Sequence, residues 1–85
     1  MAIEMLYFAW VREQVGTGAE TVDPPPEAAT VGALLDWLAT LSPGHAAAFA
    51  DRSRLRAAVD QAFVPLDASL GRPREVAIFP PVTGG

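Results

Sequence analysis

The chain has 85 residues, enough for one small domain but too few for a substrate domain beside it. Ten acidic and six basic residues give a net charge of −4, which disfavours a nucleic-acid partner because such binding needs clustered cations. The absence of cysteine excludes disulfides, thiolate metal sites and cysteine nucleophiles. All six basic residues are arginine, so lysine Schiff-base chemistry is excluded as well.

The first residues carry an early acid, Glu4, and no leading cations, unlike a secretory signal. No apolar run approaches the roughly 20 residues that a membrane span needs. We therefore expect a cytoplasmic protein with no membrane partner.

The first predicted element is a strand over residues 2–8, apolar enough on both faces to be central in a sheet. Alternation places Ile3, Met5 and Tyr7 on one side, and Leu6 and Phe8 on the other. Residues 11–15 form at most two helical turns, which Gly16 stops. Residues 20–22 form a second strand, which pairs back on the first and ends at three prolines.

The best-marked element is a helix that begins after Thr30, a residue suited to capping a helix. Five apolar residues then recur at helical spacing and predict one stripe packed on the sheet: Val31, Leu34, Leu35, Leu38 and Leu41. Ser42-Pro43-Gly44 is expected to end this helix. One helical turn over residues 46–50 and short strands over 56–59 and 63–64 follow.

Residues 75–79 form the last predicted strand. Val76 and Ile78 face the helix, whereas Ala77 and Phe79 share the outer side. The element order predicts an α+β domain in which one main helix packs on one face of a mixed sheet.

The usual catalytic constellations are missing. The single histidine, His45, follows a predicted helix stop and is expected at the surface. It cannot assemble a metal site with scattered carboxylates, so we expect no metal. Gly16-Thr17-Gly18 lacks the spacing of a phosphate-binding loop and is interpreted as a turn. Arg52, Arg54 and Arg56 are interpreted as a solvated face.

The end of the chain holds the one strong candidate site. After Phe79 come Pro80, Pro81, Val82, Thr83, Gly84 and Gly85. The two prolines stop the strand and favour an extended backbone, so six residues reach roughly 20 Å. Because glycine has no side chain, a tail that ends in Gly84-Gly85 fits a channel that is too narrow for larger residues. We therefore predict a domain over residues 1–79 and a tail over 80–85 that places a carboxylate in another protein's active site.

Three groups of residues resemble the small subunit of molybdopterin synthase: Phe8-Ala9 with Arg12-Glu13 and Gly16, Ala58-Val59 with Gln61, and the whole block from Glu75 to Gly85. The likeness covers essentially the whole chain and implies the ubiquitin-like β-grasp fold. The chain departs from the family pattern at Asp60, where many members have Asn. It departs again at residues 72–76, where they have a Gly-Asp-Glu-Val turn.

The resemblance implies that Gly85 is adenylated by an activating enzyme that uses ATP and is then converted to a thiocarboxylate by a sulfur donor system. Gly84 is its slender neighbour, and no cofactor is bound by the chain itself. The small subunit docks on a large catalytic subunit, as a heterotetramer, and gives sulfur to a cyclic pyranopterin precursor. The product is the dithiolene that later binds molybdenum.

A β-grasp sheet places its first and last strands side by side and parallel, which brings Phe8 and Phe79 to the same end of the outer face. With Leu6 and Ala77 they form an apolar patch beside the tail, the kind of surface that marks protein contacts. We expect this patch and residues 80–83 of the tail to bind both partners. Three alternatives stay open: a sulfur carrier for thiamine, cysteine or tRNA thiolation, a protein modifier joined to lysines, and a plain binding module.

Overall fold

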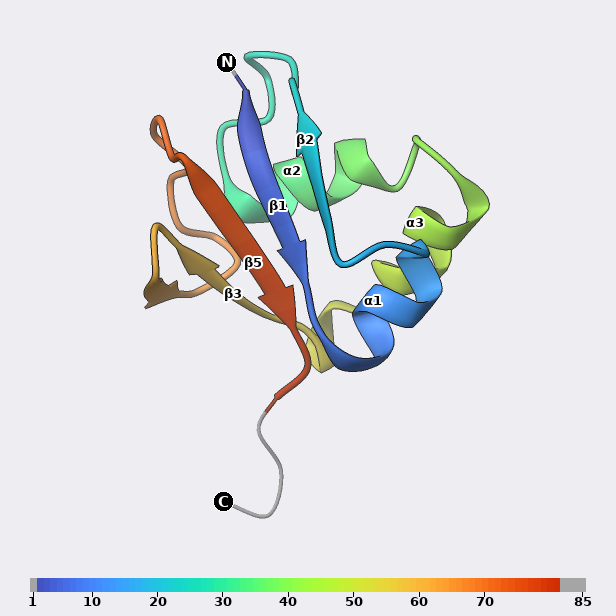
Figure 1. The fold of residues 1–85 in the computed structure, drawn as a ribbon. Coiled ribbons are helices and arrows are strands. Elements are labelled where there is room, and N and C mark those ends of the chain that lie inside the picture. Colours follow the sequence, from blue (N-terminus) through green and yellow to red (C-terminus); the bar gives the residue numbers. More distant parts are fainter. Residues whose placement is uncertain (1, 82–85) are drawn as a thin grey trace.

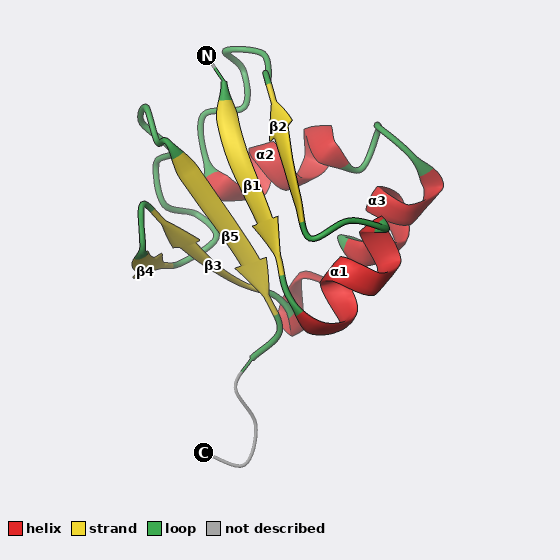
Figure 2. Cartoon of the chain, viewed as in Figure 1, coloured by secondary structure: helices red, strands yellow, loops and turns green. Residues whose placement is uncertain are grey.

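The computed structural model describes residues 2–81, in which helices cover one face of a mixed β-sheet (Figures 1 and 2). The strands are β1 (Ile3–Tyr7), β2 (Ala19–Val22), β3 (Arg56–Val59), β4 (Ala62–Val64) and β5 (Glu75–Phe79). Their order across the sheet is β2-β1-β5-β3-β4. Each strand predicted from alternation is present, which confirms the strand assignments to within a residue or two.

The central pair of strands, β1 and β5, runs parallel, and all other neighbours are antiparallel. The β1–β2 pair is the predicted hairpin. The antiparallel pairs β1–β2 and β3–β4 lie on either side of the parallel contact between β1 and β5. The helices pack on one face of this sheet, which is the β-grasp arrangement. The predicted α+β class and mixed sheet are confirmed.

The helices are α1 (Ala9–Val15), α2 (Val31–Leu38) and α3 (Pro43–Ala48), followed by a 3-10 turn, η1 (Arg52–Arg54). As predicted, Thr30 caps α2, where its hydroxyl accepts a hydrogen bond from the Ala33 amide at 3.0 Å. The α2 residues buried on the sheet are Val31, Leu34, Leu35 and Leu38. Gly16 ends α1 with a left-handed φ of 98°.

The prediction for Ser42-Pro43-Gly44 was wrong, because this segment begins α3 instead of ending α2. Ser42 accepts a hydrogen bond from the His45 amide at 3.1 Å, and Pro43 occupies the first turn, where a missing amide hydrogen costs nothing. Since α2 ends at Leu38, Leu41 falls outside its stripe and is 43% exposed.

The inner face of the sheet carries the core. Residues Ile3, Met5, Tyr7, Val76 and Ile78 point to the helices and are almost fully buried, as alternation predicts. No helix within residues 2–81 is both long enough and apolar enough to cross a membrane.

Candidate functional site

Within residues 2–81 no helix covers the outer face of the sheet (Figure 2), and a row of apolar residues crosses it. Strand register places Leu6 opposite Ala77, Ala77 opposite Ala58, and Ala58 opposite Phe63. The two alanines are 6–7% exposed and form a flat floor between the larger side chains. Four neighbouring strands therefore contribute to one continuous surface.

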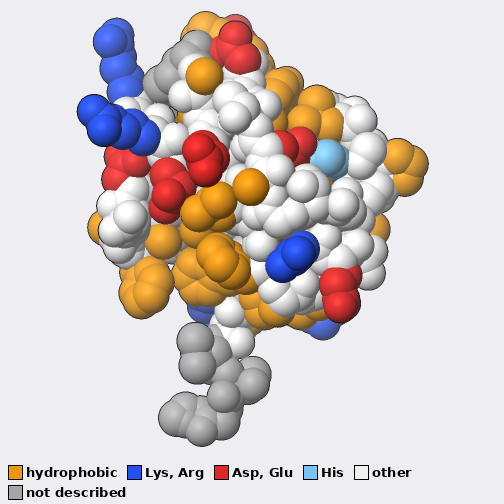
Figure 3. Space-filling view, in the orientation of Figure 1, with side chains coloured by type: hydrophobic (Ala, Val, Ile, Leu, Met, Phe, Trp, Pro, Cys, Tyr) orange, Lys and Arg blue, Asp and Glu red, His pale blue; other side chains and the backbone are white. Residues whose placement is uncertain are grey.

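Aromatic side chains lie at the end of this face where β1 and β5 finish. Phe8 follows β1 directly and is 49% exposed, while Phe63 on β4 is 83% exposed. The ring of Phe63 lies 5.7 Å from that of Phe79. We call the whole surface the apolar patch, consisting of Leu6, Phe8, Ala58, Phe63, Ala77 and Phe79. Figure 3 shows hydrophobic side chains gathered over the carboxyl ends of these strands.

The structure brings together the patch residues chosen from the sequence. Leu6, Phe8 and Phe79 lie on the same face, and neither a loop nor α1 hides Phe8. Phe63 was not predicted as part of the patch. The register of β3 and β4 places it opposite Ala58, so a predicted pairing of these two strands would have put it on the outer face. β5 ends at Phe79, and the half-buried Pro80 and Pro81 follow it. The predictions for Val82, Thr83, Gly84 and Gly85 lie outside the described residues.

The opposite end of the outer face is acidic. Glu4 and Glu75 are register partners on β1 and β5, so two carboxylates lie side by side. Figure 3 shows acidic side chains above the hydrophobic ones on this face. Like charges directly opposite each other in a sheet repel, which disfavours an acidic partner surface at this end.

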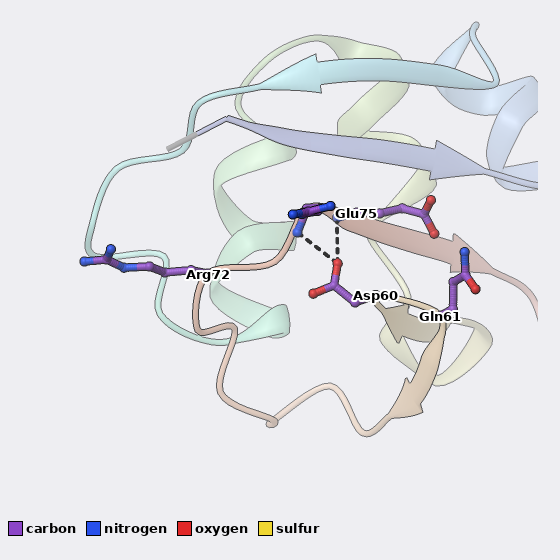
Figure 4. A pocket seen from close by; sticks show the side chains of 5 residues that line it. Asp60, Gln61, Arg72 and Glu75 are labelled. Carbon is purple, nitrogen blue, oxygen red and sulfur yellow. Dashed lines mark hydrogen bonds between the residues drawn. The ribbon is translucent and has the colours of Figure 1, made fainter.

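A shallow hollow of about 450 Å³ lies beside the acidic end, between the β3–β4 turn and the start of β5. Asp60 points to the start of β5, where its Oδ1 accepts hydrogen bonds from the backbone amides of Arg74 (2.9 Å) and Glu75 (3.1 Å) (Figure 4). Asp60 therefore fixes the turn that precedes β5. Because its acceptor oxygen is already engaged with the backbone, the hollow is better explained as structural than as catalytic.

A polar network on the inner face corrects the prediction for His45, which is only 8% exposed. Its Nε2 lies 2.7 Å from Glu20 Oε2, and its Nδ1 lies 2.6 Å from Ser42 Oγ. Tyr7 donates its hydroxyl hydrogen to the same Glu20 oxygen at 2.7 Å. The network joins β1, β2 and the start of α3, elements that are distant in the sequence.

The network shifts the pKa values of two of its members. Burial raises the pKa of Tyr7 most, and its hydrogen bond to Glu20 and the charge of that carboxylate raise it further. Burial alone would raise the pKa of Glu20, but the hydrogen bonds from His45 and Tyr7 and the attraction of His45 together lower it. Glu20 is thus held as a carboxylate that accepts two hydrogen bonds.

The serine, histidine and acid of this network have structural roles in the domain. Ser42 Oγ already accepts the His45 amide as the cap of α3. The ring of His45 packs edge-on against Tyr7, with centroids 6.4 Å apart. Within residues 2–81, no group of three or more potential metal ligands lies together. The apolar patch and the residues after it are therefore the strongest candidate site.

The ThiS family model matches residues 5–85, nearly the entire sequence. The chain belongs to the ThiS family. This ThiS-family chain is also similar to two curated proteins, both named molybdopterin synthase sulfur carrier subunit. The one from Escherichia coli (strain K12) is 47% identical over 83 residues, spanning 98% of this chain and 99% of that protein. The one from Haemophilus influenzae is 34% identical over the same coverage.

Solved structures give the same fold for this ThiS-family chain. SAMP1 from Haloferax volcanii matches with a TM-score of 0.73 and 28% identity, covering 100% of both chains. A putative molybdopterin converting factor, subunit 1, from Pyrococcus furiosus matches with a TM-score of 0.71 and 26% identity, covering 96% of this chain and 99% of that one. The β-grasp assignment therefore stands on both topology and known relatives.

Proposed function

We propose that this ThiS-family chain is the sulfur carrier subunit of a molybdopterin synthase in molybdenum cofactor biosynthesis. The observation that supports this most is its 47% identity, over almost the full length of both chains, to a protein of that name. The carrier gives sulfur to a cyclic pyranopterin precursor, on which the dithiolene forms. Its main partner is the large subunit of the synthase, with which it forms a heterotetramer.

The reacting group is the carboxylate of Gly85. An α-carboxylate is ionised at neutral pH and is a poor electrophile, so it needs activation before sulfur can be attached. An adenylyltransferase supplies it: the carboxylate attacks the α-phosphate of ATP and releases pyrophosphate. Sulfur at the oxidation level of sulfide, delivered by a donor system, then attacks the carbonyl carbon of this adenylate, displaces AMP and leaves a thiocarboxylate.

The chain is a covalent cosubstrate in this scheme, and its partners catalyse each step. It has no cysteine, so it cannot carry sulfur as a persulfide. It binds no cofactor of its own, since ATP belongs to the activating partner. Its structural contribution is to dock and to deliver the tail.

Docking is assigned to the apolar patch together with Pro80, Pro81, Val82 and Thr83, and Gly84 passes with Gly85 into the active-site channel. Support comes from the exposure of Phe8 and Phe63 on an uncovered sheet face next to the end of β5. Contiguous exposed apolar side chains are costly in water and mark protein contacts.

The chemistry is tested by incubating the protein with ATP, a sulfur donor and the cognate activating enzyme, and then measuring intact mass. We expect the gain of one sulfur in place of one oxygen. Deleting Gly85 should abolish the gain, whereas Arg72→Glu, a change at the far end of the domain, should leave it intact. An unchanged mass of the full-length protein contradicts the proposal.

Docking is tested with Phe79→Ala, which should weaken binding to both the activating enzyme and the large subunit. Leu41→Ala is a matched control, because Leu41 is also an exposed apolar residue but lies away from the patch, after α2. If Phe79→Ala binds both partners like the wild type, the patch is not the docking surface.

A second candidate function is protein modification. The observation that favours it is the match to a structure named small archaeal modifier protein 1 of H. volcanii, with a TM-score of 0.71 and 27% identity. A modifier ends up joined through Gly85 to a lysine of its target. Conjugates of higher mass in extracts of cells that express the tagged chain would favour this function, and their absence favours the free carrier.

A further inference from the structure

Three arginines cluster near the end of β5, and two of them have clear partners within the domain. Arg52 pairs with the Asp36 carboxylate on α2. Arg54 places its guanidinium 4.6 Å from the centre of the Trp10 ring, a cation–π contact. The structure therefore accounts for both of these cations.

Arg56, the third, differs from them. Its Nη1 donates to the backbone carbonyls of Leu55 (2.8 Å) and Ser53 (3.5 Å), which fixes the direction of the side chain. In the part of the chain that the structure describes, no carboxylate forms an ion pair with it. An exposed guanidinium is thus held in place with N–H groups to spare.

The guanidinium of Arg56 stands at the edge of an apolar groove. Arg56 is the register partner of Phe79, directly beside the apolar patch. The groove has a volume of about 370 Å³ and is lined by Arg56, Ala57, Phe63, Val64, Pro65 and Phe79. The two phenyl rings contact each other, with centroids 5.7 Å apart, and together form one wall of the groove. An aliphatic or aromatic side chain of a partner would pack against this wall, and its neighbour on the partner surface would meet the positive charge of Arg56.

The outer face consequently has a direction. Two carboxylates, Glu4 and Glu75, lie where β5 begins, close to Arg72 and Arg74 of the preceding loop. The apolar row crosses the middle, and Arg56 is the cation at the end where β5 finishes. An apolar surface alone permits docking in several orientations, whereas charges at its edges select one. For a carrier this selection matters because only one orientation aims the end of β5 into the active site.

We propose that Arg56 is a specificity-determining residue of docking: the groove takes an apolar side chain of the synthase large subunit, and an adjacent partner carboxylate pairs with Arg56. The inference rests on the proposed function, which supplies the large subunit as partner. It goes beyond that function by naming the chemistry of the complementary surface and the orientation that it selects.

The experiment measures the dissociation constant and association rate of the cognate large subunit with four full-length proteins at low and high salt. These are the wild type, Arg56→Leu, Arg56→Glu and the control Arg72→Glu, which alters the same charge at the other end of β5. Arg56→Leu keeps the apolar groove and should weaken binding about tenfold, with a flatter salt dependence. Arg56→Glu should weaken binding more, mainly at low salt. Arg72→Glu should stay within about twofold of the wild type.

The outcomes separate the two proposals. A wild-type chain that fails to bind the large subunit at all overturns the proposed function and this inference with it. A wild type that binds, together with Arg56→Leu and Arg56→Glu proteins that are folded and bind equally well at both salt concentrations, overturns the inference alone. Equal losses in Arg56→Glu and Arg72→Glu would also overturn it, because they would show a dependence on net charge and not on place.

Discussion

On the inner face of the sheet, Tyr7 and His45 are polar groups in a buried environment, whereas on the outer face Phe8 and Phe63 are apolar groups in water. Both depart from the simple rule that apolar groups are buried and polar ones exposed. The inner departure is resolved within the domain, because Glu20 and Ser42 satisfy the buried polar atoms. On the outer face, nothing within residues 2–81 covers the exposed side chains of Phe8 and Phe63. Buried polar atoms that find hydrogen-bond partners inside the domain stabilise the fold. Exposed apolar side chains that the domain itself does not cover indicate a surface for another molecule.

The largest expected effect is the difference in stability between two variants, each of which loses one large apolar side chain, one on the inner side of the sheet and one on its outer face. Leu35→Ala removes a fully buried side chain of α2 and should lower the free energy of unfolding by about 2–5 kcal/mol. Phe63→Ala removes a side chain that is 83% exposed and should cost less than about 0.5 kcal/mol. Urea unfolding of both variants measures the difference.

Partner binding should rank these two variants in the opposite order. Phe63→Ala should weaken binding to the large subunit, whereas Leu35→Ala should bind normally under conditions where it is folded. If Phe63→Ala destabilised the domain as much as Leu35→Ala, the outer face would have to be a second core, and the comparison of the two faces would fail.

The next effect concerns the buried network. Glu20→Ala leaves the Tyr7 hydroxyl and His45 Nε2 without their acceptor and should lower the free energy of unfolding by about 1–3 kcal/mol. Glu20→Gln is the matched control, since its amide oxygen can still accept from Tyr7, and it should cost less than Glu20→Ala. Equal stability of Glu20→Ala and the wild type would show that the network is incidental to folding.

The lowered pKa of Glu20 predicts how stability depends on pH. Because the folded state binds this proton more weakly than the unfolded state, the contribution of Glu20 is fully present above the pKa of the unfolded chain. It is lost as the pH falls through the lower pKa of the folded state. Urea unfolding at pH values from about 7 down to about 3 should therefore show a smaller acid-induced loss for Glu20→Gln than for the wild type. Identical losses would mean that other carboxylates set the acid sensitivity.

Local patterns in the sequence predicted the elements that build both faces of the sheet. Short-range signals succeeded: Thr30 with the apolar residues behind it marked α2, and alternation around Glu4 and Glu75 sorted β1 and β5 into inner and outer sides. These signals depend only on the period of a helix or strand and on a cap a few residues away. Local patterns of side chains were therefore enough to predict the strands and the main helix.

Features that depend on contacts between distant residues were missed. Ser42-Pro43 is as typical of a helix start as of a chain break, and only tertiary packing decides between them. His45 is buried because Glu20, 25 residues earlier, meets its ring, and no local pattern reports that pairing. Phe63 joins the patch through register with Ala58 on the neighbouring strand. Arg56 gains its significance from the groove beside it, which the sequence does not display.

The smallest expected effect is at the β3–β4 turn, which belongs to neither face. Asp60 and Gln61 adopt positive φ values of 48° and 71°, which suit glycine and cost energy for other residues. Gln61→Gly should therefore raise the free energy of unfolding by about 0.5–1 kcal/mol, after allowance for the greater freedom of glycine in the unfolded chain. Asp60→Gly is the control: it relieves the same kind of strain but loses the hydrogen bonds from the Arg74 and Glu75 amides, so it should give no gain. Urea unfolding measures both variants.

Binding of Gln61→Gly to the large subunit should equal that of the wild type, because the turn lies at the far end of the sheet from Phe79. A Gln61→Gly protein that bound differently would extend the docking surface beyond the apolar patch, to the acidic end of the outer face.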